Sequence, residues 1–296
     1  MKHSVKEWIL ATRPWSFPAS AMPVLVTVIY MFSIGEKVNW WLGLWALLNI
    51  VIVHAAGNVW SDYFDFKKKV DQEDTYGTKI LTSGQFEPKD TIKLSVVLQI
   101  FALVGAVGLF ILTGWELVFI VLAGVLLSLL YPPLKYIALG DVVIYFCYGF
   151  LPMLGTSFIV TGQIHWEVLW LSVPVGLITI SILHANNTRD IETDKRAKIK
   201  TFAMLMGRSV SSWIYCLEVV VPFIWITVMI VAGMLSWWVI MVWLVFPLTV
   251  KNIRMMLKWK TEGVSSYARL DEGSAQLQLA FSVLLSIGLV VGNYLN

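Results

Sequence analysis

Charged residues are scarce in this chain. Only 14% of its 296 residues are Asp, Glu, Lys or Arg, whereas 58% are hydrophobic. Because soluble domains carry about a quarter charged residues, this composition excludes a soluble domain and predicts an all-α integral membrane protein. The lipid bilayer is therefore an expected partner, and no nucleic-acid partner is expected.

Cysteines and a leader segment are also lacking. The two cysteines, Cys147 and Cys216, both lie inside apolar runs, so no disulfide framework is expected. Residues 1–14 are polar and contain no apolar stretch before a small-residue cleavage site, so no signal peptide is expected either.

What the chain does have is long apolar runs. A helix that crosses a membrane needs about 20 mostly apolar residues, and we predict nine such helices in a single domain, residues 1–296. This domain is expected to have two helical halves, about 1–140 and 141–296. The predicted spans are about 15–34, 39–61, 93–113, 115–133, 141–162, 167–187, 210–234, 236–257 and 274–295.

The distribution of basic residues supports this count. With nine spans and a cytoplasmic N-terminus, every one of the 22 Lys and Arg residues except Lys37 falls in a cytoplasmic segment. An error of one span would scatter these charges over both faces of the membrane. We therefore expect the N-terminus in the cytoplasm and the C-terminus outside.

Two rows of Asn and Asp side chains end the second and sixth spans. Within a row the residues are three or four positions apart, so each row lies on one face of a helix. Carboxylates at the edge of a bilayer are costly and mark functional sites. Both rows fall on the cytoplasmic side, where they can face each other across one central cavity. The rows are Asn58, Asp62 and Asp65, and Asn186, Asp190 and Asp194.

These rows predict a site for magnesium and a diphosphate. Mg²⁺ prefers a few carboxylate oxygens together with phosphate oxygens and water, so all six side chains are candidate metal ligands. All of them except Asp65 are also candidate catalytic residues. The alternative is that they are solvated charges at helix ends, or N-caps. Nearby cations that can neutralise the remaining phosphate charge are Lys79, Lys135, Arg189 and Lys195.

Other polar residues have two interpretations. The long loops 63–93 and 189–208 are candidate lids over the cavity. Arg13 either anchors the first span or reaches the diphosphate. For His54 and His184, a buried structural role bonded to a neighbouring helix is favoured over proton acceptance. Glu218 should face the bundle interior.

Six stretches together form a family pattern. They are RPWSFPAS at 13–20, NVWSDYFDFKKKVD at 58–71, TSG at 82–84, LKY at 134–136, LGD at 139–141 and HANNTRDIETDKR at 184–196. In these stretches the chain resembles the UbiA superfamily of intramembrane aromatic prenyltransferases, and within it the 1,4-dihydroxy-2-naphthoate polyprenyltransferases. It departs from that pattern at Lys69 and at 198–201, where glycine-containing sequences are usual, and at Asp141, where Glu is more common.

The resemblance implies a UbiA-like fold and magnesium-assisted ionisation of a polyprenyl diphosphate. The allylic group would be transferred to an aromatic acceptor, 1,4-dihydroxy-2-naphthoate, giving demethylmenaquinone. The expected location is a bacterial inner or plasma membrane, with the active-site loops cytoplasmic. The expected substrate-binding residues are Arg13, Asp71, Lys79, Tyr131, Lys135, Arg189 and Lys195.

Three alternatives stay open. The acceptor could be 4-hydroxybenzoate, homogentisate, haem or a glycerol phosphate. A transporter is a candidate from another class, but transporters place ionisable residues near the bilayer midplane, whereas these acids lie at its edge. A CDP-alcohol phosphotransferase is disfavoured because its Asp-Gly-x-x-Ala-Arg pattern is absent. Oligomeric state and prenyl chain length are not predicted.

Overall fold

A computed structural model describes residues 3–73, 75–77 and 79–295. Within these residues the chain is almost entirely helical and contains no named β-strand. This confirms the all-α prediction. The helices are α1 (Val5–Ala11), α2 (Pro18–Ser33), α3 (Trp40–Lys67), α4 (Pro88–Thr113), α5 (Glu116–Lys135), α6 (Gly140–Tyr145), α7 (Leu151–Thr161), α8 (Val168–Arg189), α9 (Ile191–Arg196), α10 (Phe202–Val231), α11 (Phe246–Leu257), α12 (Trp259–Glu262) and α13 (Leu270–Leu295).

Nine segments of the described chain are long and apolar enough to cross a membrane, as the sequence predicts. Five are single helices and four are composite. The first combines a 3₁₀ turn, Pro14–Ser16, with α2. A π-helical turn at Phe146–Phe150 joins α6 to α7 in the fifth span. The eighth combines a 3₁₀ segment, Trp237–Val245, with α11 and α12, and the ninth adds the turn Val264–Tyr267 before α13.

The ends of some spans differ from the prediction. The third span begins at Pro88 rather than at 93, because proline is favoured in the first helical turn, where its missing N–H has no intrahelical partner anyway. The seventh begins at Phe202 rather than at 210, yet Gly207 interrupts its helix with φ 72° and ψ 154°. The uninterrupted part of α10 therefore starts close to the predicted position.

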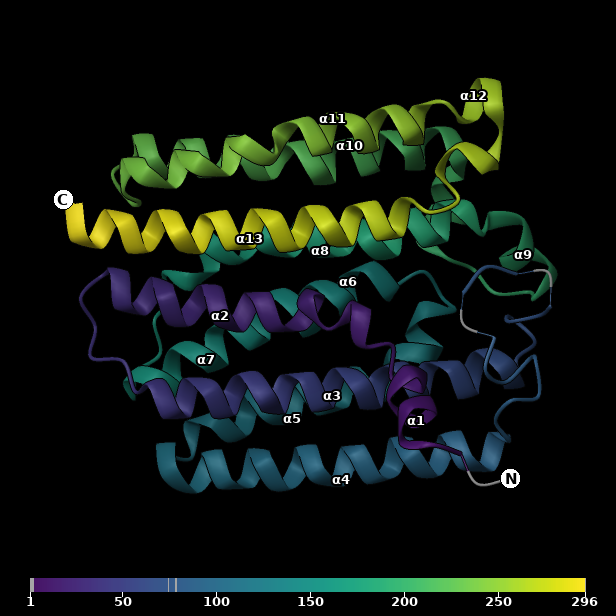
Figure 1. The fold of residues 1–296 in the computed structure, drawn as a ribbon, viewed down its shortest axis with the longest axis horizontal. Helices are drawn as coiled ribbons and strands as arrows, with labels where there is room; N and C mark the ends of the chain where they lie inside the picture. The colour runs from purple at the N-terminus through teal and green to yellow at the C-terminus, as the bar shows by residue number, and fades with distance from the viewer. Residues whose placement is uncertain (1–2, 74, 78, 296) are drawn as a thin grey trace.

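The long helices run side by side, with α10 and α11 along one edge of the bundle and α4 along the other (Figure 1). Contacts are most extensive between α3 and α4 and between α8 and α10, followed by those of α13 with α2, with the 3₁₀ segment Trp237–Val245 and with α8. Figure 1 also places α1, the α3–α4 connection and α9 at one end, whereas the C-terminus lies at the opposite end. The C-terminal ends of α3 and α8, which carry the two acid rows, therefore share one end of the bundle.

Burial differs strongly among the spans. In the most apolar window of α8, 67% of the residues are buried, whereas only 11% are buried in the corresponding windows of α4 and α5. Helix α8 is thus central, and α4 and α5 present apolar side chains such as Phe101 and Leu122 outwards. An outward apolar surface of this kind is what a lipid-facing helix requires.

Candidate active site

The first acid row lies on α3, which extends beyond the predicted end at 61 to Lys67. Asp62 and Asp65 are only 2% and 6% exposed. A buried carboxylate needs a counter-charge or several hydrogen bonds, and Asp62 has such a partner in the guanidinium of Arg13. Arg13 therefore reaches the acid row from the segment between α1 and α2.

Asp65 is held by the end of α5. Its Oδ2 accepts from Lys135 Nζ at 2.9 Å, and its Oδ1 accepts from the Tyr136 hydroxyl at 2.8 Å. Burial, followed by the charge of Asp65, raises the pKa of Tyr136 above its ordinary value, so this phenol stays protonated as a donor. The contact fixes the carboxylate between α3 and α5.

Asn58 is oriented by the N-terminal segment. Its Nδ2 donates to the Thr12 carbonyl at 2.9 Å and to Ser16 Oγ at 3.0 Å. Because both bonds use the amide nitrogen, the carbonyl oxygen is the atom that can serve as a metal ligand.

The second row lies where α8 ends and α9 begins. Arg189 donates to both oxygens of Asp190, from Nε and from one terminal nitrogen, each at 2.8 Å. The same guanidinium contacts the Ala268 carbonyl at 3.0 Å and Asp271 Oδ2 at 3.4 Å, which ties this row to the start of α13. In the described structure, Asn186 Oδ1 is buried without a hydrogen-bond partner.

The carboxylates of the two rows influence one another electrostatically. Burial raises the pKa of Asp194 to about 7, and the negative charges of Asp190 and Asp65 add to this effect while Lys135 opposes it. Asp71 behaves alike: burial raises its pKa to about 7, and Asp65 and Asp62 contribute. Negative charges on α3 and α9 therefore repel one another, and a divalent cation bound between them would reduce this repulsion.

The donor set fits Mg²⁺. All candidate ligand atoms are carboxylate or amide oxygens, which suit this hard cation. The buried, unpartnered oxygen of Asn186 gives a specific place where a ligand bond is missing. The fit requires the existing ion pairs to open, because Asp62, Asp65 and Asp190 each have a basic partner in this structure.

The remaining predicted substrate-binding residues are dispersed. Tyr131 is half-buried on α5, one turn before Lys135. The ammonium of Lys79 donates to the carbonyls of Gln72 at 2.7 Å and of Thr75, so it organises its own loop. Lys195 is exposed on α9. Their roles toward a substrate stay predictions.

Sequence reasoning assigned no role to three residues that contact the rows. These are Tyr136 on Asp65, Ser16 on Asn58, and Tyr76, whose ring lies 4.7 Å from the Arg189 guanidinium. Tyr76 comes from the α3–α4 loop, so the long loop reaches the second row, as expected for a lid. Tyr136 and Ser16 each lie in a stretch of the family pattern, LKY at 134–136 and RPWSFPAS at 13–20, whereas Tyr76 had no sequence signal.

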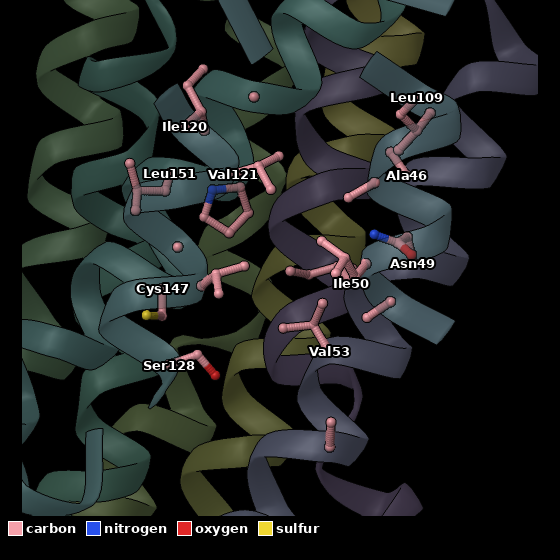
Figure 2. Close-up of a pocket in the computed structure, with 18 of the residues that line it drawn as sticks. Ala46, Asn49, Ile50, Val53, Leu109, Ile120, Val121, Ser128, Cys147 and Leu151 are labelled. Atoms are coloured by element: carbon pink, nitrogen blue, oxygen red, sulfur yellow. The ribbon is translucent and has the colours of Figure 1, made fainter. Parts of the chain in front are cut away.

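An apolar cavity of about 420 Å³ lies along α3, within the membrane-spanning part of the bundle. Its wall on α3 runs from Ala46 to Ala56, which lies two residues before Asn58. Figure 2 shows Ile50 and Val53 on one side, with Val121 and Leu151 among the side chains opposite them. Helices α4, α5 and α7 supply most of the other walls.

The three other singled-out residues are buried and bonded to neighbouring segments. His54 Nδ1 lies 2.9 Å from Ser20 Oγ on α2. His184 Nε2 lies 3.1 Å from the Ser211 carbonyl oxygen on α10. Glu218 is 7% exposed and faces the interior. Both histidines are thus buried and bonded to a neighbouring helix, and Glu218 lies inside the bundle, as expected.

Comparison with known proteins agrees with this geometry. Residues 20–270 match the model of the UbiA prenyltransferase family. The chain is 30% identical to 1,4-dihydroxy-2-naphthoate octaprenyltransferase of Bacillus subtilis, over 96% of this chain and 92% of that protein. It is 31% identical to UbiA prenyltransferase domain-containing protein 1 of Danio rerio, over 96% and 84%.

Solved structures share the fold. A UbiA homologue from Aeropyrum pernix K1 superposes with a TM-score of 0.64 at 14% identity, over 98% of this chain and 99% of that one. A UbiA homologue from Archaeoglobus fulgidus bound to GPP and Mg²⁺ gives 0.62 at 14% identity, over 94% and 99%. With the matched family model and the relatives above, these results show that the chain belongs to the UbiA prenyltransferase family and is a membrane-embedded prenyltransferase.

Proposed function

We propose that this enzyme transfers a polyprenyl group from its diphosphate to 1,4-dihydroxy-2-naphthoate in a Mg²⁺-dependent reaction that yields demethylmenaquinol, the reduced form of demethylmenaquinone. The observation that carries the proposal is that two acid rows, each with its own cations, share one end of the bundle, while an apolar cavity lies along α3 close to the first row. One end of this arrangement suits a metal–diphosphate group and the other suits a hydrocarbon tail.

At the acid rows, binding of the diphosphate requires the carboxylates and their basic partners to separate. In the substrate complex the carboxylates of Asp62, Asp65 and Asp190 would release these basic partners and hold Mg²⁺. Their partners Arg13, Lys135 and Arg189 then turn to phosphate oxygens, where guanidinium groups bind in a bidentate manner. Bound Mg²⁺ supplies charge neutralisation of the diphosphate as its C–O bond breaks.

The tail end is the apolar cavity. Its volume of about 420 Å³ lies within the range of small-ligand sites, and its lining is predominantly aliphatic. A chain that begins at Asn58 and follows α3 towards Ala46 keeps its allylic carbon beside the acid rows. Because α4 and α5 are sparsely buried, a longer tail can continue between them into lipid.

The chemistry at the acceptor is a substitution on an electron-rich ring. The allylic C–O bond breaks with its electron pair on the diphosphate, and a new C–C bond forms at the ring carbon that bears the carboxylate. The ring then loses carbon dioxide, and the electron pair of that broken C–C bond restores the aromatic quinol. Support for this acceptor comes from the Bacillus subtilis relative, which is a 1,4-dihydroxy-2-naphthoate octaprenyltransferase.

Prenyl transfer in isolated membranes tests the proposal. Radiolabelled polyprenyl diphosphate is supplied with 1,4-dihydroxy-2-naphthoate, 4-hydroxybenzoate, homogentisate, haem or a glycerol phosphate, with and without Mg²⁺. We expect product with the naphthoate, dependent on Mg²⁺, and a loss of at least about 100-fold in Asp62→Asn and Asp190→Asn, as for removal of a charge-stabilising group. Product only with a different acceptor would contradict the assignment.

A single cavity variant tests the tail site separately. Gly124 lines the cavity and has no atom within 4 Å of where a Cβ would stand. Gly124→Leu should therefore fill the cavity and raise the KM for long prenyl diphosphates about tenfold, while the KM for a geranyl donor changes little. Gly124→Ala is the matched control. An equal rise in KM for the long and the geranyl donors would show that the cavity does not bind the distal part of the prenyl tail.

A further inference from the structure

A second polar cluster lies inside the membrane-spanning part of the bundle, apart from the two acid rows. Among the residues that the structure describes, Asp141, His184 and Glu218 bring one ligand atom each within 4.8 Å of one another. They come from α6, α8 and α10, and their exposed fractions are 8%, 0% and 7%. None of them has a role in the prenyl transfer described above.

Hydrogen-bond partners determine which nitrogen of His184 carries its proton. The Thr188 hydroxyl donates to the His184 carbonyl at 2.8 Å, so in its contact with Ser211 the serine hydroxyl is the donor. Ser211 Oγ and the Ser211 carbonyl oxygen are then both acceptors toward His184 Nε2, at 2.8 and 3.1 Å. Nε2 therefore carries the hydrogen, and Nδ1 of the neutral ring has a lone pair.

That lone pair points at two carboxylates. Nδ1 lies 3.0 Å from Asp141 Oδ2 and 3.3 Å from Glu218 Oε1. Ionised carboxylates are acceptors only, so three electron pairs converge on one point in a low-dielectric region. Unless a cation occupies that point, this arrangement is strongly unfavourable.

A proton alone satisfies the cluster poorly. Protonation of His184 leaves two carboxylates with a single positive charge, so Glu218 would need a second proton. Its other oxygen, Oε2, is buried without a hydrogen-bond partner in the described structure. A proton on Oε2 would donate to nothing, and a proton on Oε1 would leave Oε2 still unpartnered. A divalent cation, by contrast, neutralises both carboxylates and gives Oε2 a ligand bond.

The distances and the surroundings suit a metal. With metal–ligand bonds of about 2.0–2.2 Å, tetrahedral donors lie about 3.4 Å apart, close to the observed 3.0 and 3.3 Å. Metal-bound histidines usually donate their other N–H to a backbone carbonyl, as His184 does to Ser211. Asn187 Nδ2 donates to the other oxygen of Asp141 at 3.2 Å, which orients that carboxylate.

We propose that Asp141, His184 and Glu218 bind a first-row divalent cation of the Zn²⁺ type, distinct from the Mg²⁺ of the acid rows. One imidazole and two carboxylates form a ligand set that suits such a cation. The ion would join α6, α8 and α10. His184 and Thr188, one helical turn apart, face this cluster, whereas Asn186 and Asp190 lie on another side of the same helix end. The site is therefore structural, and it holds α8 in place behind the second acid row.

Metal binding to the full-length protein in detergent tests this directly. The protein is stripped with a chelator, dialysed and titrated with Zn²⁺ alone and with Co²⁺ alone, and bound metal is measured by mass spectrometry and by visible Co²⁺ absorption. All samples carry Asp62→Asn and Asp190→Asn, so that the acid rows contribute little. We expect about one Zn²⁺ per chain and a Co²⁺ spectrum that Glu218→Gln abolishes.

The controls separate this proposal from folding and from the proposed function. Glu218→Gln preserves the shape of the side chain, and Glu192→Gln, at an exposed position on α9, should leave metal binding unchanged. Zn²⁺ should raise the Tm of the background protein and not that of Glu218→Gln. A background protein that binds neither Zn²⁺ nor Co²⁺, or a Glu218→Gln variant that binds both as well, would overturn the proposal. Because no substrate is present, neither outcome depends on which acceptor the enzyme uses.

Discussion

The buried ion pair between Asp65 and Lys135 should contribute strongly to the stability of the metal-free protein. The two side chains are 8% and 15% exposed, and their charged atoms are 2.9 Å apart. Asp65→Asn keeps an acceptor for Tyr136 but leaves the ammonium of Lys135 without its counter-charge in a buried position. Loss of one partner of a buried pair costs about 3–5 kcal/mol, and partial access to water at Lys135 sets our expectation near about 3 kcal/mol.

A double-mutant cycle isolates this pair. Lys135→Met removes the cation, and the double variant Asp65→Asn/Lys135→Met should be more stable than Asp65→Asn alone, with a coupling energy of at least about 1.5 kcal/mol. Denaturant unfolding of the detergent-solubilised protein in a chelator measures it. The exposed pair Lys258–Glu262, also at 2.9 Å, is the matched control, and its coupling should be below about 0.5 kcal/mol. Additive effects at Asp65 and Lys135 would refute the reasoning.

Three further outcomes follow from local geometry. Lys69 has a left-handed backbone with φ 59°, which is strained for a residue with a Cβ, whereas its neighbour Lys68 has φ −84°. Lys69→Gly should therefore stabilise the protein by about 1 kcal/mol in thermal unfolding, and the control Lys68→Gly should not. A Cβ at Gly288 would stand 2.7 Å from Val239 Cα and 2.8 Å from the Trp238 carbonyl oxygen. Gly288→Ala should therefore lower the free energy of unfolding by about 1–3 kcal/mol. Gly124→Ala, where the space is open, should leave it unchanged or slightly higher. Burial raises the pKa of Asp194 to about 7 in the folded protein, from 3.8 for an unperturbed Asp side chain. Between these pH values the folded state therefore holds a proton that the unfolded state has lost. Stability in a chelator should therefore fall as pH rises from about 4 to 7, and Asp194→Asn should flatten that slope; an unchanged slope would contradict the assignment.

The nine spans were predictable because their signal is local. Length and apolar content of about 20 consecutive residues identify a membrane helix, and Lys37 alone violates the charge distribution expected for nine spans. The ends were less predictable, since Gly207 breaks α10 through a backbone conformation that its sequence neighbours do not specify. The two departures at Lys69 and Lys198 have a physical meaning only in the structure, where both residues have positive φ. Glycine is favoured in that region of backbone space.

The acid rows were predictable as rows, but their partners were not. Spacing along a helix puts Asn58, Asp62 and Asp65 on one face, whatever the helix packs against. The contacts Arg13–Asp62 and Lys135–Asp65 join residues 49 and 70 positions apart, and they depend on the packing of α3 against the N-terminal segment and α5. The cluster of Asp141, His184 and Glu218 needs three helices to meet. The transporter alternative is no longer required, because the chain belongs to a family of prenyltransferases.

The most direct test of the central claim is a structure of the enzyme with Mn²⁺ in place of Mg²⁺ and an unreactive thio-analogue of a polyprenyl diphosphate, with Mn²⁺ located by its anomalous scattering. We predict Mn²⁺ between the two acid rows, within about 2.0–2.3 Å of oxygens from both α3 and the α8–α9 junction. The prenyl tail should follow α3 towards Ala46. Mn²⁺ bound to one row only, or a tail that leaves on a side away from α3, would contradict the account.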